Sequence, residues 1–303
     1  MAVISQAVLD ALRTTIVTKF EQAYKTAPIF WDKIAMREAS ASKSNTYGWP
    51  DVLPKMREWL GSRAYHDVKE RQITINNKDF ELSFEIDAND IEDDNLGIRA
   101  KNIAMQGRAA AKHWDYLLRD LIEAADATTG FDGQFFFDTD HPIDINNPGL
   151  GTQSNRFTSS ALSSANFNTV LTAMQEMKGA DNEPIGAFQD LSQVILMVPP
   201  QLRKTAREIV KVETISAGGE NPQAGDAQIL VVPELTSSTK WFLIDASMDI
   251  MPFGIQVRKE PEVTQLTSAT NDVVFDQRKF RYGVHARGDA FLGLYFLAAQ
   301  ADE

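Results

Sequence analysis

Residues 71–86 have the sequence Arg71-Gln-Ile-Thr-Ile-Asn-Asn-Lys-Asp-Phe-Glu-Leu-Ser-Phe-Glu-Ile86. Apolar residues alternate with polar ones on both sides of residues 76–79, which is the period of a β-strand with one buried face. The segment between the two runs, Asn76-Asn-Lys-Asp79, has the composition of a tight turn. The stretch therefore predicts two strands that form a β-hairpin with one apolar face and one wet face.

The hydrophobic period changes to that of a helix directly after this stretch. Residues 87–96 are rich in Asp, Glu and Asn, and acidic side chains at a helix start stabilise its unpaired N–H groups and complement its dipole. The pattern predicts a helix over 96–125, about 45 Å long at 1.5 Å per residue. A compact chain of this length is only about 50 Å across, so this helix is expected to span the molecule. Its apolar stripe consists of Ile103, Gly107, Ala110, Trp114, Leu117, Leu118, Leu121, Ile122 and Ala125.

The segment before the predicted hairpin is expected to be a helix on a tether. Pro28 ends a run of helical periodicity, and residues 37–46 are small and polar, which indicates a mobile connector. An amphipathic helix on such a connector must bury its apolar stripe on the body of the protein or on another copy. The stripe consists of Val3, Ile4, Val8, Leu12, Ile16, Val17, Phe20 and Tyr24.

The second half of the chain predicts a mixed domain followed by further strands. Helical periodicity over 166–178 and 202–212 alternates with strand patterns at 194–198, 228–232 and 240–244. Additional strands are predicted at 255–258, 273–275, 280–286 and 291–297. With 303 residues, the chain has about two domains' worth of length. The fold class is therefore predicted to be α+β.

The composition excludes several classes of protein. Hydrophobic residues make up 43% and charged residues 24% of the chain, which is enough apolar material for a folded core. The absence of cysteine excludes disulfides, thiolate metal sites and cysteine nucleophiles. The longest apolar stretch, residues 290–299, is too short to span a membrane, and no signal peptide is visible, so a cytoplasmic product is expected.

Charge is distributed unevenly along the chain. The net charge is −12 overall, but +3 over residues 1–80 and −6 over each of residues 81–100 and 131–190. An acidic chain lacks the concentrated basic face of a dedicated nucleic-acid binder. The basic and acidic segments could instead pair between neighbouring copies, or they could be an ordinary solvated surface.

Few residues of the sequence suggest catalysis or the binding of a metal ion or cofactor. Asp138, Asp140 and His141 are close in sequence and could bind a cation, but their spacing fits no calcium loop and no helical zinc motif. Glu92, Asp93 and Asp94 are explained by helix-start electrostatics. Nucleophile elbows and phosphate-binding glycine loops are not found. No catalytic, cofactor-binding or metal site is therefore predicted.

Taken in order, five motifs of this chain resemble one protein family. The similarity extends collinearly from about residue 1 to 290, and the family is that of the major head subunits of Mu-like phages and prophages. The first motif runs from Tyr47-Gly-Trp49-Pro to Met56-Arg-Glu-Trp59-Leu-Gly61-Ser-Arg63. It is followed by Ile75-Asn76-Asn-Lys-Asp-Phe80-Glu and Ile91-Glu92-Asp93-Asp94-Asn-Leu-Gly97. The last are Phe131-Asp132-Gly133-Gln-Phe-Phe-Phe137-Asp-Thr-Asp140-His141-Pro142 and Asn221-Pro222.

The resemblance implies the tailed-phage major capsid fold first described for Hong Kong 97. Under this scheme, residues 1–45 are the N-terminal arm and residues 46–88 an extended β-hairpin loop. Residues 89–150 are a peripheral domain that contains the spine helix 96–125, residues 151–250 are the axial domain, and residues 251–303 are strands that return to the peripheral domain.

The resemblance also implies a structural role rather than an enzymatic one. The chain is expected to self-assemble through hexamers and pentamers into the icosahedral virion head that encloses the phage DNA. Its expected partners are other copies of itself, a separate scaffolding protein, the portal and the packaged double-stranded DNA, bound non-specifically, and assembly is expected in the host cytoplasm. The fold and assembly positions are then Trp49, Trp59, Gly61, Arg63, Asn76, Phe80, Glu92, Asp93, Asp94, Gly97, Asp132, Gly133, Phe137, Asp140 and His141.

Two other classes of protein stay open on the residues alone. A phage tail or portal-proximal protein would assemble as tubes or as a single ring. A carboxylate-metal hydrolase would use Asp138, Asp140 and His141.

Overall fold

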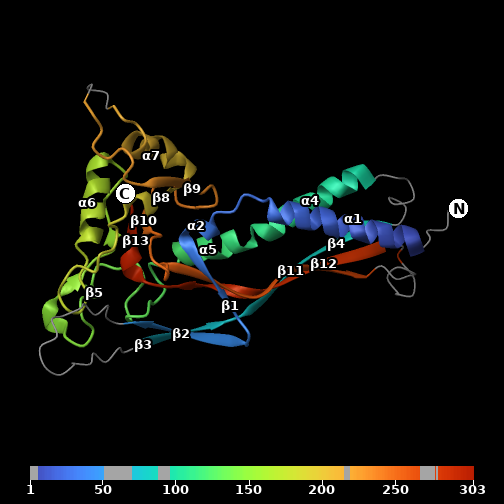
Figure 1. Cartoon of the computed structure of the whole chain (residues 1–303), viewed down its shortest axis with the longest axis horizontal. Coiled ribbons are helices and arrows are strands. Elements are labelled where there is room, and N and C mark those ends of the chain that lie inside the picture. Colours follow the sequence, from blue (N-terminus) through green and yellow to red (C-terminus); the bar gives the residue numbers. More distant parts are fainter. Residues whose placement is uncertain (1–5, 51–69, 88–95, 215–218, 267–276, 278) are drawn as a thin grey trace, which may run out of the picture.

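The computed structural model describes residues 6–50, 70–87, 96–214, 219–266, 277 and 279–303. One end of the elongated molecule holds a mixed part with helices α6 and α7 and the C-terminus (Figure 1). A long sheet covered by helices α1, α4 and α5 extends from it toward the other end (Figure 1). We call these the axial part and the peripheral part.

The peripheral sheet has the strand order β1-β11-β12-β4. Strand β1 (Ala35–Ala39) is parallel to β11 (Phe253–Leu266), and β12 (Lys279–Leu292) runs antiparallel to both β11 and β4 (Lys78–Asp87). Along β12 buried residues alternate with half-buried ones. The buried face packs against the helices, so the alternation seen in the sequence separates a helix-covered face from a wet face.

The helix predicted over 96–125 is confirmed up to residue 123, with one interruption. Helices α4 (Leu96–Ala111) and α5 (His113–Glu123) meet at Lys112, whose backbone keeps right-handed helical angles of φ −73° and ψ −5°. The Lys112 N–H still donates to the Arg108 carbonyl at 3.1 Å. The two helices follow one another along the molecule (Figure 1), and the predicted stripe from Ile103 to Ala125 is buried or half-buried.

Helix α1 (Gln6–Lys25) lies on α4 of the same chain. Ile16 and Phe20 are buried in a cluster with Ile103 of α4 and with Phe280 and Tyr282 of β12. The part of the predicted stripe whose side chains are described is therefore packed on the body of the protein through Ile16 and Phe20. The Tyr24 hydroxyl donates to Glu260 at 3.1 Å; burial, reinforced by the Glu260 carboxylate, raises the pKa of Tyr24 to about 12.

The mobile connector predicted over 37–46 is wrong. Residues up to Ala39 belong to β1, and β2 (Ser44–Pro50) begins five residues later. Small polar residues order the turn between them, because the Asn77 side-chain amide donates to Ser40 Oγ and to the Ser42 carbonyl, both at 2.8 Å. Composition alone did not distinguish a flexible linker from a turn held by side-chain hydrogen bonds.

The predicted hairpin over 71–86 is also wrong, although both of its strands exist. Strand β3 (Glu70–Asn76) pairs with β2, whereas β4 pairs with β12, and only Asn77 separates β3 from β4. Asn77 is buried and its side-chain oxygen accepts a hydrogen bond from Gln256 at 2.7 Å. The chain thus passes from one sheet to another at a fixed point instead of turning back on itself.

The axial sheet has the strand order β7-β13-β10-β8-β9. Its strands are β7 (Arg156–Phe157), β8 (Val194–Val198), β9 (Gln228–Val231), β10 (Trp241–Asp245) and β13 (Ala298–Ala301). The helices predicted here are confirmed as α6 (Ser164–Gln175) and α7 (Arg203–Val210). The strand predicted at 273–275 lies outside the described residues.

The C-terminal strand prediction needs correction. Strand β12 ends at Leu292, a 3₁₀ turn covers Tyr295–Leu297, and β13 pairs with β10 and β7 of the axial sheet. The end of the chain therefore completes the axial sheet rather than returning to the peripheral one. Its small, wholly buried residues fit between two neighbouring strands. The shorter elements are α2 (Trp31–Ile34), β5 (His141–Pro142), β6 (Thr152–Gln153) and the 3₁₀ turns Pro148–Leu150, Leu191–Gln193 and Pro200–Leu202.

Asp115 joins the start of α5 to the segment before β1. Its Oδ1 accepts hydrogen bonds from the backbone N–H groups of Phe30 and Trp31, both at 3.0 Å. Burial raises the pKa of this carboxyl group, against the lowering effect of the two hydrogen bonds. Because the folded-state pKa lies above the unfolded value, ionised Asp115 costs stability at neutral pH, and this cost disappears as the pH falls toward 4.

The Asp115→Asn variant is therefore expected to be at least as stable as the wild type at pH 7, since the amide oxygen still accepts both bonds. Asp115→Leu removes the acceptor and is expected to cost about 1–3 kcal/mol. Urea unfolding of the unassembled chain at pH 7 and pH 5 measures both variants. Equal losses for Asn and Leu would show that the carboxylate charge itself is required.

Candidate assembly surfaces

The motif residues Asp132 and His141 meet in a buried network between the peripheral and axial parts. His141 Nδ1 lies 2.6 Å from Asp132 Oδ2, and Nε2 lies 3.1 Å from Asn155 Oδ1. The imidazole stacks on the Tyr295 ring, with centroids 3.8 Å apart and planes 2° apart. His141 is completely buried, so both ring nitrogens and one ring face are occupied by the protein itself.

Neighbouring motif residues shape the loop around this network. Gly133 has φ +93°, which favours glycine, and its N–H donates to the Gly130 carbonyl at 3.4 Å. Phe137 is fully buried, with its ring 5.7 Å from that of Phe242 on the axial sheet and 6.5 Å from that of Phe253 on the peripheral one. These positions are therefore folding positions at the junction of the two sheets.

Two other acidic residues of this motif, Asp138 and Asp140, do not form a metal-binding group with His141. Asp138 accepts hydrogen bonds from the N–H groups of Phe135 and Thr139, at 3.3 and 2.7 Å, and Asp140 is exposed. Within the described ranges there is no group of three His, Asp or Glu residues that could hold a metal ion. The carboxylate-metal hydrolase hypothesis thus loses the arrangement that it needs.

The remaining motif residues are dispersed. Trp49 pairs with Arg71 across β2 and β3, Asn76 pairs with Ser44, and the Phe80 ring lies 4.2 Å from that of His113. Gly97 lies in the first turn of α4. Trp59, Gly61, Arg63, Glu92, Asp93 and Asp94 lie outside the described residues.

Sequence reasoning missed Asn155 and Tyr295, which complete the buried network. They lie 14 and 154 positions after His141, and neither belongs to a local pattern that indicates a polar contact. Only the crossing of the chain between the two sheets brings them together.

A groove with apolar walls lies between strand β4 and the helices α4 and α5. Two hollows, of about 230 and 200 Å³, follow this edge of the sheet. Met105 and Tyr116 line it while 66% and 42% exposed. In the described part of the chain β4 pairs with β12 alone, so its other edge is open. The groove residues include Phe80, Leu82, Phe84, Ile86, Asn102, Ile103, Met105, Gln106, Ala109, His113 and Tyr116.

The opposite, wet face of the peripheral sheet carries a charge ladder between β12 and β4. Arg281 and Lys279 both contact Glu85, at 2.7 and 2.8 Å, and these hydrogen bonds, led by that of Lys279, lower the pKa of Glu85. Farther along, Arg287 lies 3.3 Å from Asp79. Part of the acidic segment after residue 78 is therefore neutralised within its own chain.

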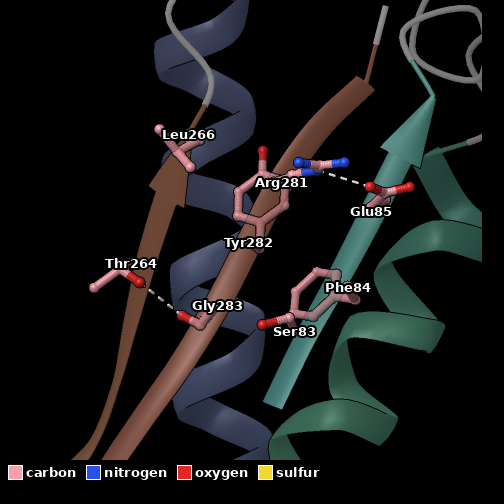
Figure 2. A pocket seen from close by; sticks show the side chains of 8 residues that line it. All are labelled: Ser83, Phe84, Glu85, Thr264, Leu266, Arg281, Tyr282 and Gly283. Atoms are coloured by element: carbon pink, nitrogen blue, oxygen red, sulfur yellow. Dashed lines mark hydrogen bonds and ion pairs between the residues drawn. The ribbon is translucent and has the colours of Figure 1, made fainter. Parts of the chain in front are cut away.

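The Arg281–Glu85 pair of the ladder lines a hollow of about 580 Å³, shown in Figure 2. Two small residues that pair across the strands, Gly283 and Ser83, are part of its lining. Thr264 closes one side, with its hydroxyl donating to the Gly283 carbonyl at 3.2 Å, and the Arg281–Glu85 pair closes another. The charges that line it are paired with each other.

No helix in the described ranges is long and apolar enough to cross a membrane.

Solved structures that align with this chain include capsid subunits of bacteriophages. The procapsid subunit of bacteriophage JBD30 aligns with a TM-score of 0.64 and 28% identity over 99% of this chain and 76% of that chain. The capsid subunit of cyanophage P-SCSP1u, at 12% identity, has a TM-score of 0.59 over 91% of this chain and 88% of that chain. The fold is therefore the Hong Kong 97-like capsid fold, as the resemblance implied.

Sequence comparison defines the family. The chain belongs to the Mu-like prophage major head subunit gpT family, whose sequence model matches residues 9–161, 157–235 and 234–303. The Mu-like prophage FluMu major head subunit of Haemophilus influenzae is 26% identical over 298 residues, 98% of this chain and 74% of that protein. The major capsid protein of Escherichia phage Mu is 27% identical over 296 residues, 98% of this chain and 74% of that protein.

The chain is accordingly a structural major capsid protein of the virion head, not an enzyme. Its structural neighbours are assembled capsids, which supports self-association into shells.

Proposed function

We propose that this chain assembles through pentamers and hexamers into an icosahedral head that encloses double-stranded DNA. A separate scaffolding protein and a portal complete the proposed assembly, which takes place in the host cytoplasm. Membership of the gpT head-subunit family carries this proposal. Contacts between different faces of identical subunits are the kind that close into rings, as pentamers and hexamers require.

We assign the parts of the capsid fold to the observed elements as follows. Helix α1 is the arm, the β2–β3 pair is the extended loop, and α4 with α5 is the spine helix. This assignment differs from the scheme based on the sequence at three strands. Strands β1 and β4 are assigned to the peripheral sheet rather than to the arm and the loop, and β13 is assigned to the axial sheet rather than to the peripheral one. These reassignments follow from the strand pairings.

The β4–α4 groove is the surface that we expect a neighbouring copy to cover. Its hollows are lined mainly by apolar side chains, and Met105 and Tyr116 are large side chains left open to water. Removing apolar surface of this kind from water stabilises an interface by about 25 cal/mol per Å². A shell repeats the contact at every copy, so a modest gain per groove becomes a large one for the assembly.

The proposed function is tested by sedimentation of the purified chain, alone and co-expressed with its scaffolding protein, with negative-stain microscopy of the fast fractions. Closed shells or five- and six-fold rings are expected. Tubes or a single ring size would support a tail or portal-proximal protein instead. A compact monomer under both conditions would contradict shell formation.

Substitution of Met105 tests the groove. Met105→Glu is expected to reduce shell yield at least tenfold, because it places a charge in a contact that must lose water. The unfolding midpoint of the unassembled chain should not change, since this side chain is 66% exposed. Met105→Leu keeps the apolar surface and should assemble normally. Normal shells from both variants would exclude the groove as a contact.

A further inference from the structure

The orientation of the Asn155 side chain determines where one proton of His141 lies. The Asn155 amide nitrogen lies 2.8 Å from the Phe136 carbonyl and 3.1 Å from each of the Tyr295 and Ala298 carbonyls. Its Oδ1 accepts the Asp138 N–H at 2.9 Å. The reverse orientation would aim an amide oxygen at three carbonyl oxygens and an NH₂ group at an N–H. Asn155 Oδ1 is therefore an acceptor toward His141, and His141 Nε2 must carry a proton.

The second ring nitrogen faces a carboxylate. Asp132 Oδ1 accepts the Gln134 N–H at 3.2 Å, and Asp132 Oδ2 lies 2.6 Å from His141 Nδ1. At this distance a proton must lie between the two atoms, because two lone pairs would repel each other. With Nε2 already protonated, the pair holds one proton more than a neutral imidazole and a carboxylate hold together.

We propose that His141 is an imidazolium ion in the folded chain and that its extra proton holds the junction between the peripheral and axial sheets. The proton lies on the ring rather than on the carboxyl group because imidazole is ordinarily the stronger base, with a pKa near 6.5 against 3.9 for Asp. Removing it leaves either the Asn155 contact or the Asp132 contact without a hydrogen. His141 is completely buried, so water cannot replace the lost bond.

The hydrogen-bond network around His141 lies where the peripheral and axial parts meet, so its loss would weaken the contact between them. Asp132 lies in the loop that follows α5 of the peripheral part, and His141 is the first residue of β5. Asn155 directly precedes β7, and Tyr295 and Ala298 lie where the chain leaves β12 and enters β13. Two of the three crossings between the two sheets in the described chain, from β4 to β7 and from β12 to β13, therefore pass through one set of hydrogen bonds, whereas the third runs directly from β10 to β11.

Among the described residues, no third charged side chain forms a direct contact with the His141–Asp132 pair, so the positive imidazolium and the negative carboxylate neutralise each other. Its direct polar contacts in the described chain are Asn155 and Gln134, with the Tyr295 ring stacked on the imidazole. Asp144 and Lys178 line a cavity of about 40 Å³ beside Asp132 and Tyr295. Asp138 uses its backbone N–H on Asn155 and its carboxylate on its own loop.

A pH effect with a definite sign follows. An unfolded histidine releases its proton near pH 6.5, whereas the folded network needs that proton. Unfolding above this pH therefore releases a proton, so a rise in pH favours the unfolded chain. The junction should loosen as the pH rises.

Asp132→Asn provides a matched control for the proton. The side-chain amide that this substitution introduces can donate to Nδ1 of a neutral imidazole while Nε2–H still donates to Asn155, so both hydrogen bonds survive without the extra proton. This variant should fold at pH 7, and its stability should be much less dependent on pH between 6.5 and 9 than that of the wild type.

Nitrogen NMR of the unassembled chain with ¹⁵N-labelled histidine reads the proton directly, with the His141 signals assigned by their loss in His141→Gln. At pH 7 we expect both ring nitrogens of His141 to be protonated in the wild type, and only Nε2 in Asp132→Asn. A single protonated ring nitrogen in the wild type would overturn the proposal. So would wild-type and Asp132→Asn unfolding curves with the same pH dependence.

Discussion

Replacing Trp114 by alanine is expected to lower the free energy of unfolding by about 3–5 kcal/mol, the range for a large buried aromatic side chain. Trp114 belongs to α5, and its side chain, 2% exposed, packs against β12. Gly288 of β12 is packed so closely against it that a Cβ at Gly288 would lie 2.9 Å from the indole ring. The residues around Trp114 cannot fill the space that alanine would leave unless α5 moves relative to β12.

Urea unfolding of the unassembled chain measures this loss, and Trp114→Phe should lie between the wild type and alanine. Domains are commonly stable by only about 5–15 kcal/mol, so the alanine variant should also give few shells at 37 °C. An alanine variant within 1 kcal/mol of the wild type would show that the spine helix is held mainly by other contacts.

Replacing Gly107 by leucine is expected to displace helix α1 from α4, at a cost of about 1–3 kcal/mol. A Cβ at Gly107 would lie 2.6 Å from the Phe20 carbonyl oxygen, so even one added carbon requires the helices to separate. Leucine is a better helix former than glycine by roughly 0.8 kcal/mol. A loss of stability would therefore come from the contact between the helices and not from α4 itself.

Hydrogen exchange and limited proteolysis should detect the change within residues 6–25, because α1 loses its packing surface. Arg108→Leu, on an exposed position of the same helix, is the matched control and should leave α1 protected. Unchanged protection of α1 in Gly107→Leu would mean that the two helices adjust to each other.

The parts of the fold that were predicted from the sequence depend on local periodicity. The spine helix, its stripe around Trp114, and helices α6 and α7 follow from spacings within one element, and burial enforces that spacing. The strands at 71–86 were placed correctly for the same reason. Their partners were not, because alternation determines which face of a strand is buried but not which strand lies beside it.

The assembly residues show the same division. The sequence suggests a cation site at His141 because Asp138 and Asp140 are close to it, but the structure buries His141 against Asp132, a residue indicated only by the family resemblance. Asn155 and Tyr295 gave no signal, since their role depends on contacts across 14 and 154 residues of chain. The exposure of Met105 could not be predicted either, because the sequence of a helix does not show whether a neighbouring element covers a methionine that lies outside the apolar stripe.

The charge ladder helps to determine the register in which β12 and β4 pair. On the wet face, β12 presents Lys279, Arg281, Gly283, His285 and Arg287 to Asp87, Glu85, Ser83, Glu81 and Asp79 of β4, in that order. A shift of the two strands by two residues keeps every apolar side chain on its own face, so burial alone discriminates poorly against this error. Such a shift in either direction would, however, place a basic side chain opposite Ser83 and a carboxylate opposite Gly283. The uncharged pair at the centre thus marks the correct alignment, and each mismatched rung would cost about 0.2–1 kcal/mol. A protein that is made in many identical copies needs the same strand register in each copy, and this charge pattern disfavours the wrong register before a copy joins a shell.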